Sequence, residues 1–223
     1  MKYFAHQPVD VICGVDEAGK GSVLGPMVVA AVAVPAEDVL DDLGVKDSKL
    51  LSAKERERLY SLIKKRCKVA TVRLDANEID AIRTEMTMNA AVARAHAQVI
   101  RKLSPDCAYV DACDVNIFRY AEMVKSYLDN HCEIVSEHHA DEKFPVVSAA
   151  SIIAKVTRDR AIATLSKKYG DLGSGYPSDP VTIRFLNDWI DEHRTPPPIA
   201  RKSWKTVGAI LARRSQKSLM DFG

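Results

Sequence analysis

Two adjacent carboxylates, Asp16 and Glu17, stand where an apolar segment gives way to the glycine-rich turn Gly19-Lys20-Gly21. In an α/β fold, side chains at the end of a strand face the crevice where ligands bind. Carboxylate oxygens are ligands that Mg²⁺ prefers, whereas bare backbone N–H groups and a lysine bind an anion. The pair and the turn together predict a cation held against a phosphate.

Two further acids occupy comparable positions, because Asp111 ends a short apolar segment and Asp141 follows another. Several buried carboxylates repel one another, and their proximity is costly unless cations offset the charge. Four carboxylates could hold two Mg²⁺ ions about 4 Å apart, which stabilises the attacking and leaving oxygens in phosphodiester cleavage. Asp16, Glu17, Asp111 and Asp141 are therefore the candidate metal ligands and catalytic residues.

The elements that must position these acids follow from hydrophobic periodicity, caps and prolines. The expected strands cover residues 9–16, 23–35, 69–74, 107–111 and 133–137. Four helices are expected over residues 86–103, 116–130, 145–168 and about 203–214. Two more are expected to begin at Ser52 and at Asp179. Strands come first, then alternate with helices, and a helical part follows. This order predicts an α/β protein with a central mixed sheet flanked by helices.

Composition places the chain among ordinary globular proteins. Its 223 residues suffice for one generous domain, or for one domain with a small appendage, and 47% are apolar and 28% charged. We expect no membrane span and no signal peptide, because no apolar run has the required length. The five cysteines are odd in number and include no Cys-x-x-Cys pair, so reduced thiols and a cytoplasmic location are expected.

The net charge is only +2, but basic residues are concentrated near the C-terminus. Seven stand in one stretch without an intervening acid: Arg194, Arg201, Lys202, Lys205, Arg213, Arg214 and Lys217. A solvated surface is the usual meaning of such a run, and a nucleic-acid contact is the alternative.

Two glycine patterns near the acids do not fit a nucleotide-binding protein. Gly14-x-x-x-x-Gly19-Lys20 begins a phosphate loop, but Gly21 replaces the required Ser or Thr and another strand follows instead of a helix. Asp16 and Glu17 would also lie inside the cradle and repel the phosphates. Gly19-x-Gly21 lacks the helix and the third glycine of a dinucleotide-binding fingerprint.

The cluster His138-His139-Ala-Asp141-Glu142 contains several residues of the types that ligate zinc. A zinc site would need a further His, Cys or carboxylate at suitable spacing, and none stands out. The two histidines are therefore expected to be polar neighbours rather than ligands.

Six segments, in order along the chain, resemble the motifs of type 2 ribonuclease H (ribonuclease HII). They are Gly14-Val-Asp16-Glu17-Ala-Gly-Lys-Gly-Ser-Val-Leu-Gly-Pro26, Val45-Lys-Asp47-Ser48-Lys49-Leu50, Tyr109-Val-Asp111-Ala, Glu137-His-His-Ala-Asp141, Ala149-Ala-Ser-Ile-Ile-Ala-Lys155-Val-Thr-Arg-Asp159 and Gly173-Ser-Gly-Tyr176-Pro-Ser-Asp179-Pro. The resemblance spans residues 11 to about 208, and the Glu-His-x-Ala-Asp form is similar to archaeal members. It implies a ribonuclease H-like fold.

The resemblance also implies the chemistry. The four carboxylates would ligate two Mg²⁺ or Mn²⁺ ions, and water would attack the phosphate 5′ to a ribonucleotide, leaving 3′-hydroxyl and 5′-phosphate ends. Gly19-Lys20-Gly21 matches the family's Gly-Arg-Gly, whose backbone reads the ribose 2′-hydroxyl. Lys20 departs from the commoner arginine, so it keeps the charge but loses a bidentate fork.

Tyr176 matches the family's tyrosine that stacks on the sugar following the ribonucleotide and contacts the 2′-hydroxyl, the group that distinguishes RNA from DNA. The alternative is a loop aromatic packed beside Pro177. Lys49, Lys143 and Lys155 are candidate phosphate contacts, although Lys155 could instead pair with Asp159 one helical turn on.

The last eight residues, Gln216-Lys-Ser-Leu219-Met-Asp-Phe222-Gly223, resemble the peptide that docks on DNA sliding clamps. Leu219 and Phe222 would enter a hydrophobic pocket while Gln216 adds hydrogen bonds. The second aromatic usual in that motif is Gly223 here. The alternative is that Leu219 and Phe222 pack back onto the domain.

We therefore expect a monomeric, metal-dependent endoribonuclease that cuts RNA in RNA–DNA hybrids and incises beside ribonucleotides embedded in DNA, removing misincorporated ribonucleotides and replication primers. The expected parts are a catalytic domain over residues 1–190, a basic helical substrate-binding part over 191–215 and a clamp-binding tail over 216–223. A junction resolvase of the same fold, or a clamp-tethered protein that binds hybrids without cutting them, are the alternatives.

Overall fold

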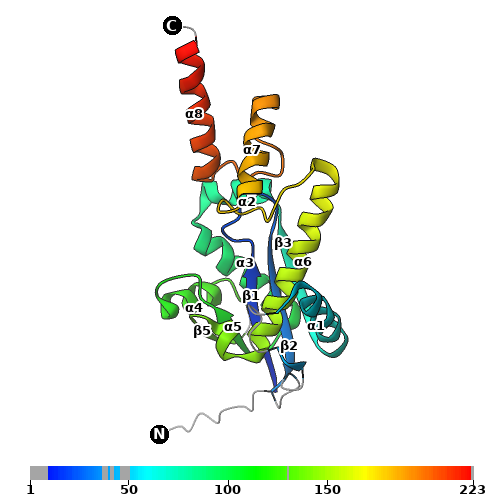
Figure 1. Cartoon of the computed structure of the whole chain (residues 1–223). Helices are drawn as coiled ribbons and strands as arrows, with labels where there is room; N and C mark the ends of the chain where they lie inside the picture. The colour runs from blue at the N-terminus through cyan, green and yellow to red at the C-terminus, as the bar shows by residue number, and fades with distance from the viewer. Residues whose placement is uncertain (1–9, 37–39, 41–42, 46–50, 130, 222–223) are drawn as a thin grey trace. The chain divides into compact units, whose positions relative to one another are not determined.

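The computed structural model of the chain describes residues 10–36, 40, 43–45, 51–129 and 131–221, with the backbone alone from residue 217 onward. The strands are β1 (Val11–Ala18), β2 (Met27–Pro35), β3 (Lys68–Leu74), β4 (Cys107–Asp111) and β5 (Glu133–Glu137). The helices are α1 (Ala53–Arg66), α2 (Ala76–Glu85), α3 (Met88–Leu103), α4 (Ile117–Lys125), α5 (Ala140–Lys143), α6 (Pro145–Tyr169), α7 (Pro180–His193) and α8 (Lys205–Asp221) (Figure 1).

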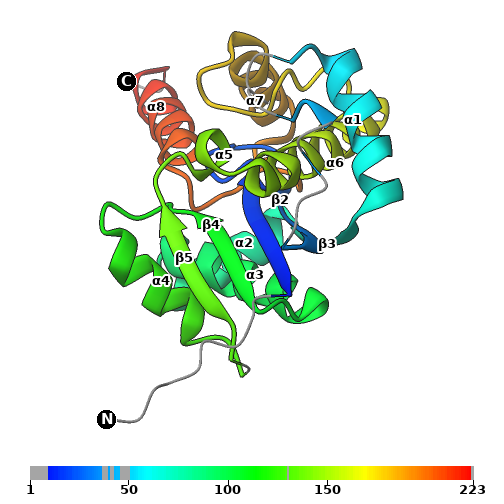
Figure 2. The same ribbon diagram turned by 90° about the horizontal axis from the view of Figure 1, so that it is seen from below.

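The strands form one five-stranded sheet in the order β3-β2-β1-β4-β5, which confirms the predicted mixed sheet flanked by helices. Strand β4 runs parallel to both β1 and β5, and Figure 2 shows the three side by side. In the register, Val15 is opposite Val110 and Asp111 is opposite Glu137. The carboxyl ends of these strands, where the candidate acids stand, therefore meet at one edge of the sheet.

Most predicted elements are confirmed, and the helix starts agree best. Ser52 caps α1 with a complete capping box to Glu55, and Asp179 caps α7 ahead of a first-turn proline. The predicted strand over 23–35 was wrong at its start, since β2 begins only at Met27. Gly25, which has a φ of +75°, and the following proline interrupt the extended chain there.

Four helices differ from the prediction, since α2 and α5 were missed and α4 and α8 end at other residues. Helix α2 was missed, although Asp75 and Glu78 form a capping box at its start. Helix α4 ends at Lys125 rather than near residue 130, and Ser126, Tyr127 and Asp129 beyond it have weak helix propensity. Helix α8 continues to Asp221 instead of ending near 214, since no glycine or proline follows Arg214 before Gly223.

The chain divides into two compact units. Unit 1 comprises Met1–Glu17, Val29–Val72 and Val92–Val156, and unit 2 comprises Ala18–Val28, Arg73–Ala91 and Thr157–Gly223. The predicted boundaries at residues 190 and 215 stay a prediction.

A glycine permits close packing in unit 1. A Cβ added to Gly14 on β1 would lie 2.2 Å from the carbonyl carbon of Val146 and 2.3 Å from the backbone nitrogen of Val147. The first turn of α6 therefore rests directly on the backbone of β1. Val146 and Val147 are themselves buried, so this contact belongs to the core of unit 1.

Three buried thiols lie on neighbouring strands of unit 1: Cys13 on β1, Cys107 on β4 and Cys132 just before β5. Burial, followed by the charge of Glu133, raises the pKa of Cys107 to about 11. Burial, followed by the neighbouring Cys107, raises the pKa of Cys132 to about 12. All five cysteines of the chain are among the described residues, and none forms a disulfide. Of the helices built from described residues, none combines the length with the apolar composition that crossing a bilayer demands.

The core of unit 2 forms around Val23 and Leu24, the residues that follow the glycine turn. The N–H groups of both residues donate to the Gly175 carbonyl, at 2.8 and 3.0 Å, and Leu24 pairs with Ala200 in an isolated antiparallel bridge. Buried side chains of α7 and α8, including Leu186, pack against this segment. The chain after the turn is thus fixed from two sides within its own unit.

Candidate active site

Four carboxylates of unit 1 lie at the carboxyl ends of the neighbouring strands β1, β4 and β5. Asp16 and Glu17 lie on β1, Asp111 is the last residue of β4, and Asp141 is in the first turn of α5, just beyond β5. Asp16 and Asp141 are largely buried, with exposed fractions of 7% and 8%. The structure therefore places all four candidate acids at the same edge of the sheet.

Backbone donors hold two of these carboxylates. The Glu17 N–H donates to Asp16 Oδ1 at 2.7 Å, and the Ala140 N–H donates to Asp111 Oδ1 at 2.8 Å. The second bond ties the end of β4 to the start of α5, and Asp141 is the next residue of that helix. Strand register and backbone hydrogen bonds, rather than flexible side chains, thus set where the acids stand.

Burial and neighbouring carboxylates raise the pKa values of Asp16 and Asp111. Burial, followed by the charge of Glu17, raises the pKa of Asp16 well above its usual value. Burial, followed by the charges of Glu17 and Asp141, raises the pKa of Asp111, although the Ala140 N–H acts in the opposite direction. The four acids are therefore close enough for their charges to interact, and the metal-free site is electrostatically unfavourable.

The donor set fits hard divalent cations. Clustered buried carboxylates offer the oxygen ligands that Mg²⁺ and Mn²⁺ take, and a cation would relieve the repulsion that raises their pKa values. Across the part of the chain that the structure describes, no three His, Cys, Asp or Glu side chains already converge as a ready-made metal cage.

Sequence reasoning missed two residues, His96 and Tyr120, that form a chain of contacts with the Glu17 side chain. The Nε2 atom of His96 is 3.1 Å from Glu17 Oε2, and the Tyr120 hydroxyl is 3.2 Å from the Nδ1 atom of the same histidine. His96 and Tyr120 are both completely buried. A histidine and a tyrosine on otherwise apolar helix faces were the only signal in the sequence.

The glycine turn belongs to unit 2. Gly19 has a φ of +86°, and its N–H donates to the Tyr176 hydroxyl at 3.1 Å. The N–H and hydroxyl of Ser22 both donate to the Gly19 carbonyl, at 3.3 and 2.9 Å. Tyr176 thus contacts the turn itself, and its role in contacting the substrate stays a prediction. A Cβ at Gly19 would lie 2.7 Å from the Pro26 carbonyl oxygen, so the position excludes other residues.

Arg201 holds this turn from inside unit 2. Its guanidinium donates to the carbonyls of Gly19 at 2.6 Å, Lys20 at 2.8 Å and Gly25 at 3.2 and 3.3 Å. The side chain is completely buried, and burial, followed by the charge of Arg158, lowers its pKa to about 9. Arg201 was included in the basic run as a candidate duplex contact, but its buried side chain serves the turn instead.

Arg158 is a second buried arginine, and no role was predicted for it from the sequence. Its guanidinium carbon lies 4.7 Å from the centre of the Tyr176 ring, and its Nη2 donates to the Ser174 carbonyl at 2.9 Å. A Cβ at Gly19 would fall 2.3 Å from Arg158 Nε. One face of the Tyr176 ring is therefore supported by an arginine that also packs on Gly19.

The candidate lysines differ in their surroundings. Lys143 is exposed and donates to Glu137 Oε2 at 2.5 Å, whereas Lys155 donates to Ser151 Oγ at 2.8 Å. Lys49 lies outside the described residues. Their roles as phosphate contacts stay predictions.

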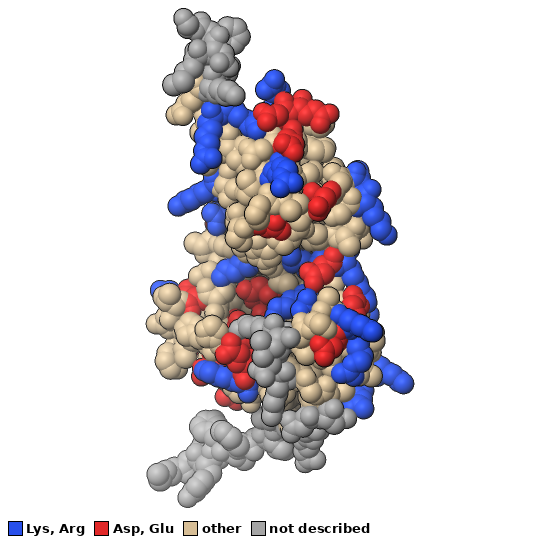
Figure 3. All heavy atoms as spheres, in the orientation of Figure 1, with Lys and Arg blue, Asp and Glu red and all other residues tan. Residues whose placement is uncertain are grey.

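The rest of the basic run is divided between structure and surface. Arg214 Nη2 donates to the Asn187 carbonyl at 2.8 Å, and its Nη1 pairs with Asp191, so this arginine ties α8 to α7. Arg194, Lys202, Lys205 and Arg213 are exposed, and the side chain of Lys217 lies outside the description. Figure 3 shows basic side chains along α8. A nucleic-acid contact by the exposed members of the run stays a prediction.

The histidines expected to be polar neighbours have protein partners. His139 Nδ1 lies 3.7 Å from Glu142 Oε1, and His138 Nε2 lies 3.4 Å from the Val115 carbonyl. Their side chains are exposed, and neither contact resembles a zinc site.

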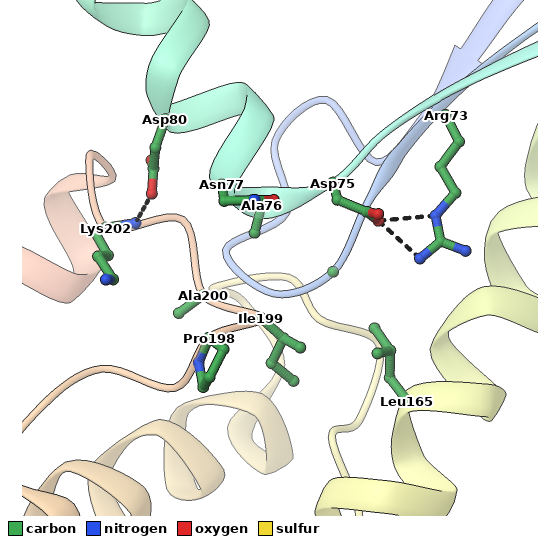
Figure 4. A pocket seen from close by; sticks show the side chains of 11 residues that line it. Arg73, Asp75, Ala76, Asn77, Asp80, Leu165, Pro198, Ile199, Ala200 and Lys202 are labelled. Atoms are coloured by element: carbon green, nitrogen blue, oxygen red, sulfur yellow. Dashed lines mark hydrogen bonds and ion pairs between the residues drawn. The ribbon is translucent and has the colours of Figure 1, made fainter.

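A cavity of about 510 Å³ in unit 2 is a poor rival for the catalytic role. It lies beside the start of α2, and its acids are already engaged (Figure 4). Arg73 Nη2 lies 2.7 Å from Asp75, and Asp80 accepts the N–H groups of Lys202 and Ser203 at 2.8 and 3.0 Å. The remaining wall is apolar, with Leu165 and Ile199.

Comparison with known proteins gives a consistent family. The family model described as Ribonuclease HII matches residues 13–207. A Ribonuclease HII from Methanoregula boonei is 69% identical over 212 residues, which cover 95% of this chain and 100% of that protein. One from Methanospirillum hungatei is 58% identical with the same coverage.

Solved structures agree. The ribonuclease H2 of Pyrococcus horikoshii OT3 has a TM-score of 0.86 and 39% identity, over 92% of this chain and 99% of that one. The RNase HII solved in a PCNA:RNase HII complex from Archaeoglobus fulgidus has a TM-score of 0.83 and 45% identity, over 87% and 95%.

Proposed function

Since the chain belongs to the ribonuclease HII family, whose members are endoribonucleases acting on RNA–DNA hybrids, we propose that it also incises duplex DNA 5′ to a single embedded ribonucleotide. The observation that carries the proposal is the sequence continuity of β1 with the glycine turn. Only Ala18 separates Glu17, one of the clustered acids, from Gly19. A residue that reads the sugar and residues that act on its phosphate are thus adjacent in the chain.

Asp16, Glu17, Asp111 and Asp141 would hold two divalent ions, Mg²⁺ or Mn²⁺. When bound, such ions supply positive charge that activates water and stabilises the leaving oxygen in phosphodiester hydrolysis, which leaves 3′-hydroxyl and 5′-phosphate ends. The residues themselves contribute fixed positions, because backbone N–H groups hold Asp16 and Asp111. Preorganised ligands lower the cost of assembling the charged site.

Recognition of the ribose would rest on the glycine turn and Tyr176. Arg201 occupies the carbonyls of Gly19 and Lys20, so the orientation of this turn is fixed before substrate binds. Among the described residues, and apart from its two neighbours in the chain, no atom lies within 4 Å of a Cβ added at Gly21, which is exposed. This open space beside bare backbone suits the approach of a sugar, and the 2′-hydroxyl is both a donor and an acceptor.

Substituting Gly21→Ala tests this assignment. The new methyl group meets no protein atom and Gly21 does not have a positive φ, so folding should be unchanged. The methyl would fill the space proposed for the sugar, and single-ribonucleotide incision should fall about 10- to 100-fold, as expected for a small displacement of substrate. The measurement is steady-state incision of a duplex with one ribonucleotide, with product ends mapped.

Gly208→Ala is the matched control, because its Cβ also meets nothing within 4 Å and it lies on α8. Normal incision by Gly21→Ala would remove the glycine turn from the recognition site. Cutting of four-way junctions with no incision at the ribonucleotide would favour a resolvase. Hybrid binding without Mg²⁺-dependent, chelator-sensitive scission would favour a non-enzymatic role.

We further propose that residues 216–223 bind a DNA sliding clamp. The support is the motif itself and the A. fulgidus relative, which was solved in complex with PCNA. Gln216 is exposed on α8, whereas Phe222 lies outside the described residues, and the Leu219 side chain is likewise not described. Recruitment by a clamp fits removal of misincorporated ribonucleotides and primers by a cytoplasmic monomer.

Deleting residues 216–223 should weaken binding to an archaeal PCNA at least about tenfold, the loss expected when an anchoring side chain is removed from a small interface. Cleavage of a short hybrid without the clamp should be unchanged. Surface plasmon resonance measures the first quantity and a gel assay the second. Replacing Ser218 by Ala is the control within the tail, since it spares the three motif positions. Equal clamp affinity of deleted and full-length chains would contradict the proposal.

A further inference from the structure

Glu17 faces a buried pair of side chains that has no part in the function described above. His96 on α3 and Tyr120 on α4 are both 0% exposed, and the Glu17 side chain is 10% exposed. The three residues form one chain of contacts, 3.1 Å from Glu17 Oε2 to His96 Nε2 and 3.2 Å from His96 Nδ1 to the Tyr120 hydroxyl. The two rings meet edge to face, with an angle of 87° between their planes.

The direction of the Glu17 contact follows from the chemistry of its partners. An ionised carboxylate only accepts hydrogen bonds, so Nε2 must carry the hydrogen that points at Glu17 Oε2. This holds for the neutral ring and for the imidazolium. The hydroxyl of Tyr120 then donates to Nδ1 in the first case and accepts from it in the second. Every ring nitrogen therefore has a partner in either state.

The neighbours of His96 on α3 are apolar. Val92, Val99 and Ile100, at four residues before and three and four residues after His96, are all completely buried, so the histidine stands on the apolar face of α3. An apolar residue would pack there without needing hydrogen-bond partners. The structure instead uses a buried donor that is aimed at a carboxylate and is held by a second helix.

We propose that His96 and Tyr120 are positioning residues that fix the orientation of Glu17 for divalent-cation binding. The inference rests on the proposed role of Glu17 as a metal ligand. His96 engages Oε2, which leaves Oε1 as the oxygen without this contact, and so restricts how the carboxylate presents itself to a cation. Tyr120 in turn fixes the plane of the imidazole. Partners of this kind commonly change metal affinity by about 10- to 100-fold.

The test is Mn²⁺ binding to the full chain, measured by isothermal titration calorimetry in the absence of substrate. His96→Leu removes the hydrogen-bond donor and puts an apolar side chain of similar bulk in its place. It should weaken Mn²⁺ binding about 10- to 100-fold. His96→Gln can still place an amide N–H near Glu17, so it should restore most of the affinity. Tyr120→Phe retains the ring packing and should cause a smaller loss, in the same direction.

A double-mutant cycle separates this proposal from the metal site itself. In a Glu17→Gln background, His96→Leu should have no further effect on Mn²⁺ affinity, because the carboxylate that it positions is gone. If Glu17→Gln binds Mn²⁺ normally, the proposed metal site fails. If Glu17→Gln weakens binding but His96→Leu does not, or if the two losses are independent, only the positioning role fails. Thermal unfolding of each variant in chelator identifies changes that are merely structural.

Discussion

The variant Asp16→Asn is expected to lose cleavage of both hybrid and single-ribonucleotide substrates while it still binds hybrid DNA. Even a partner that only orients a metal ligand changes affinity or activity by about 10- to 100-fold, so loss of a ligand charge should reduce turnover by more than about 100-fold. Binding should remain measurable, because contacts outside the acids are unchanged. The measurements are initial rates in Mg²⁺ and in Mn²⁺, and a fluorescence anisotropy titration in chelator.

The same substitution should leave the metal-free protein at least as stable as the original. The pKa of Asp16 is raised in the folded state, so ionisation of this group opposes folding: its stabilisation is present below the ordinary carboxylate pKa and is lost as the pH rises through the raised value. Asparagine removes that charge. In chelator, the unfolding midpoint of Asp16→Asn should exceed that of the original chain increasingly as the pH rises. Near-normal turnover would contradict the site assignment, and a lower midpoint at neutral pH would contradict the electrostatic argument.

Gly14→Ala is expected to have the largest effect on stability. Its new methyl group would lie 2.2 Å from a backbone atom of Val146, which cannot move aside as a flexible side chain could. Separating the first turn of α6 from β1 should cost about 3 kcal/mol or more of unfolding free energy, at the upper end of the range for overpacked cores. Urea unfolding followed by circular dichroism measures this loss.

Gly208→Ala controls for the chemical change itself. This glycine is exposed on α8 with nothing within 4 Å of its Cβ, so alanine should stabilise the helix by about 0.5–1 kcal/mol. The two substitutions should therefore move the unfolding midpoint in opposite directions. A fully folded, stable Gly14→Ala protein would mean that the α6 contact with β1 is looser than the structure has it.

Sequence patterns identified the elements whose signals are local. The caps of α1 and α7 and the strand that ends at Asp111 were all predicted, because capping side chains and apolar runs act over a few residues. Helix α2 was missed although Asp75 provides the same kind of cap, since the polar Ala76–Glu85 segment has only a short apolar face. The end of α8 was predicted too early, because no glycine or proline near residue 214 or Asp221 marks where the helix stops.

The site was predictable where residue type alone is distinctive. Acids at strand ends and the Gly19-Lys20-Gly21 turn are unusual enough to be found in the sequence. Arg201, in contrast, looked like one more member of a basic surface. Its three carbonyl partners lie about 180 residues away along the chain, as the 182-residue separation from Gly19 shows, so only the fold brings them together. His96 and Tyr120 are similar, because a buried polar pair has no signature in the sequence separate from the apolar faces of the two helices that carry it.

The three thiols buried in the sheet give the protein an internal reporter of opening. Cys13, Cys107 and Cys132 are buried, and the pKa values of their thiols are raised. Very little thiolate is therefore available to an alkylating reagent while β1, β4 and β5 stay paired. Cys67 and Cys113 are only partly buried and are the more accessible pair. The rate at which a maleimide modifies the three slower cysteines therefore follows the separation of β1, β4 and β5 in the unmodified chain, with no engineered probe.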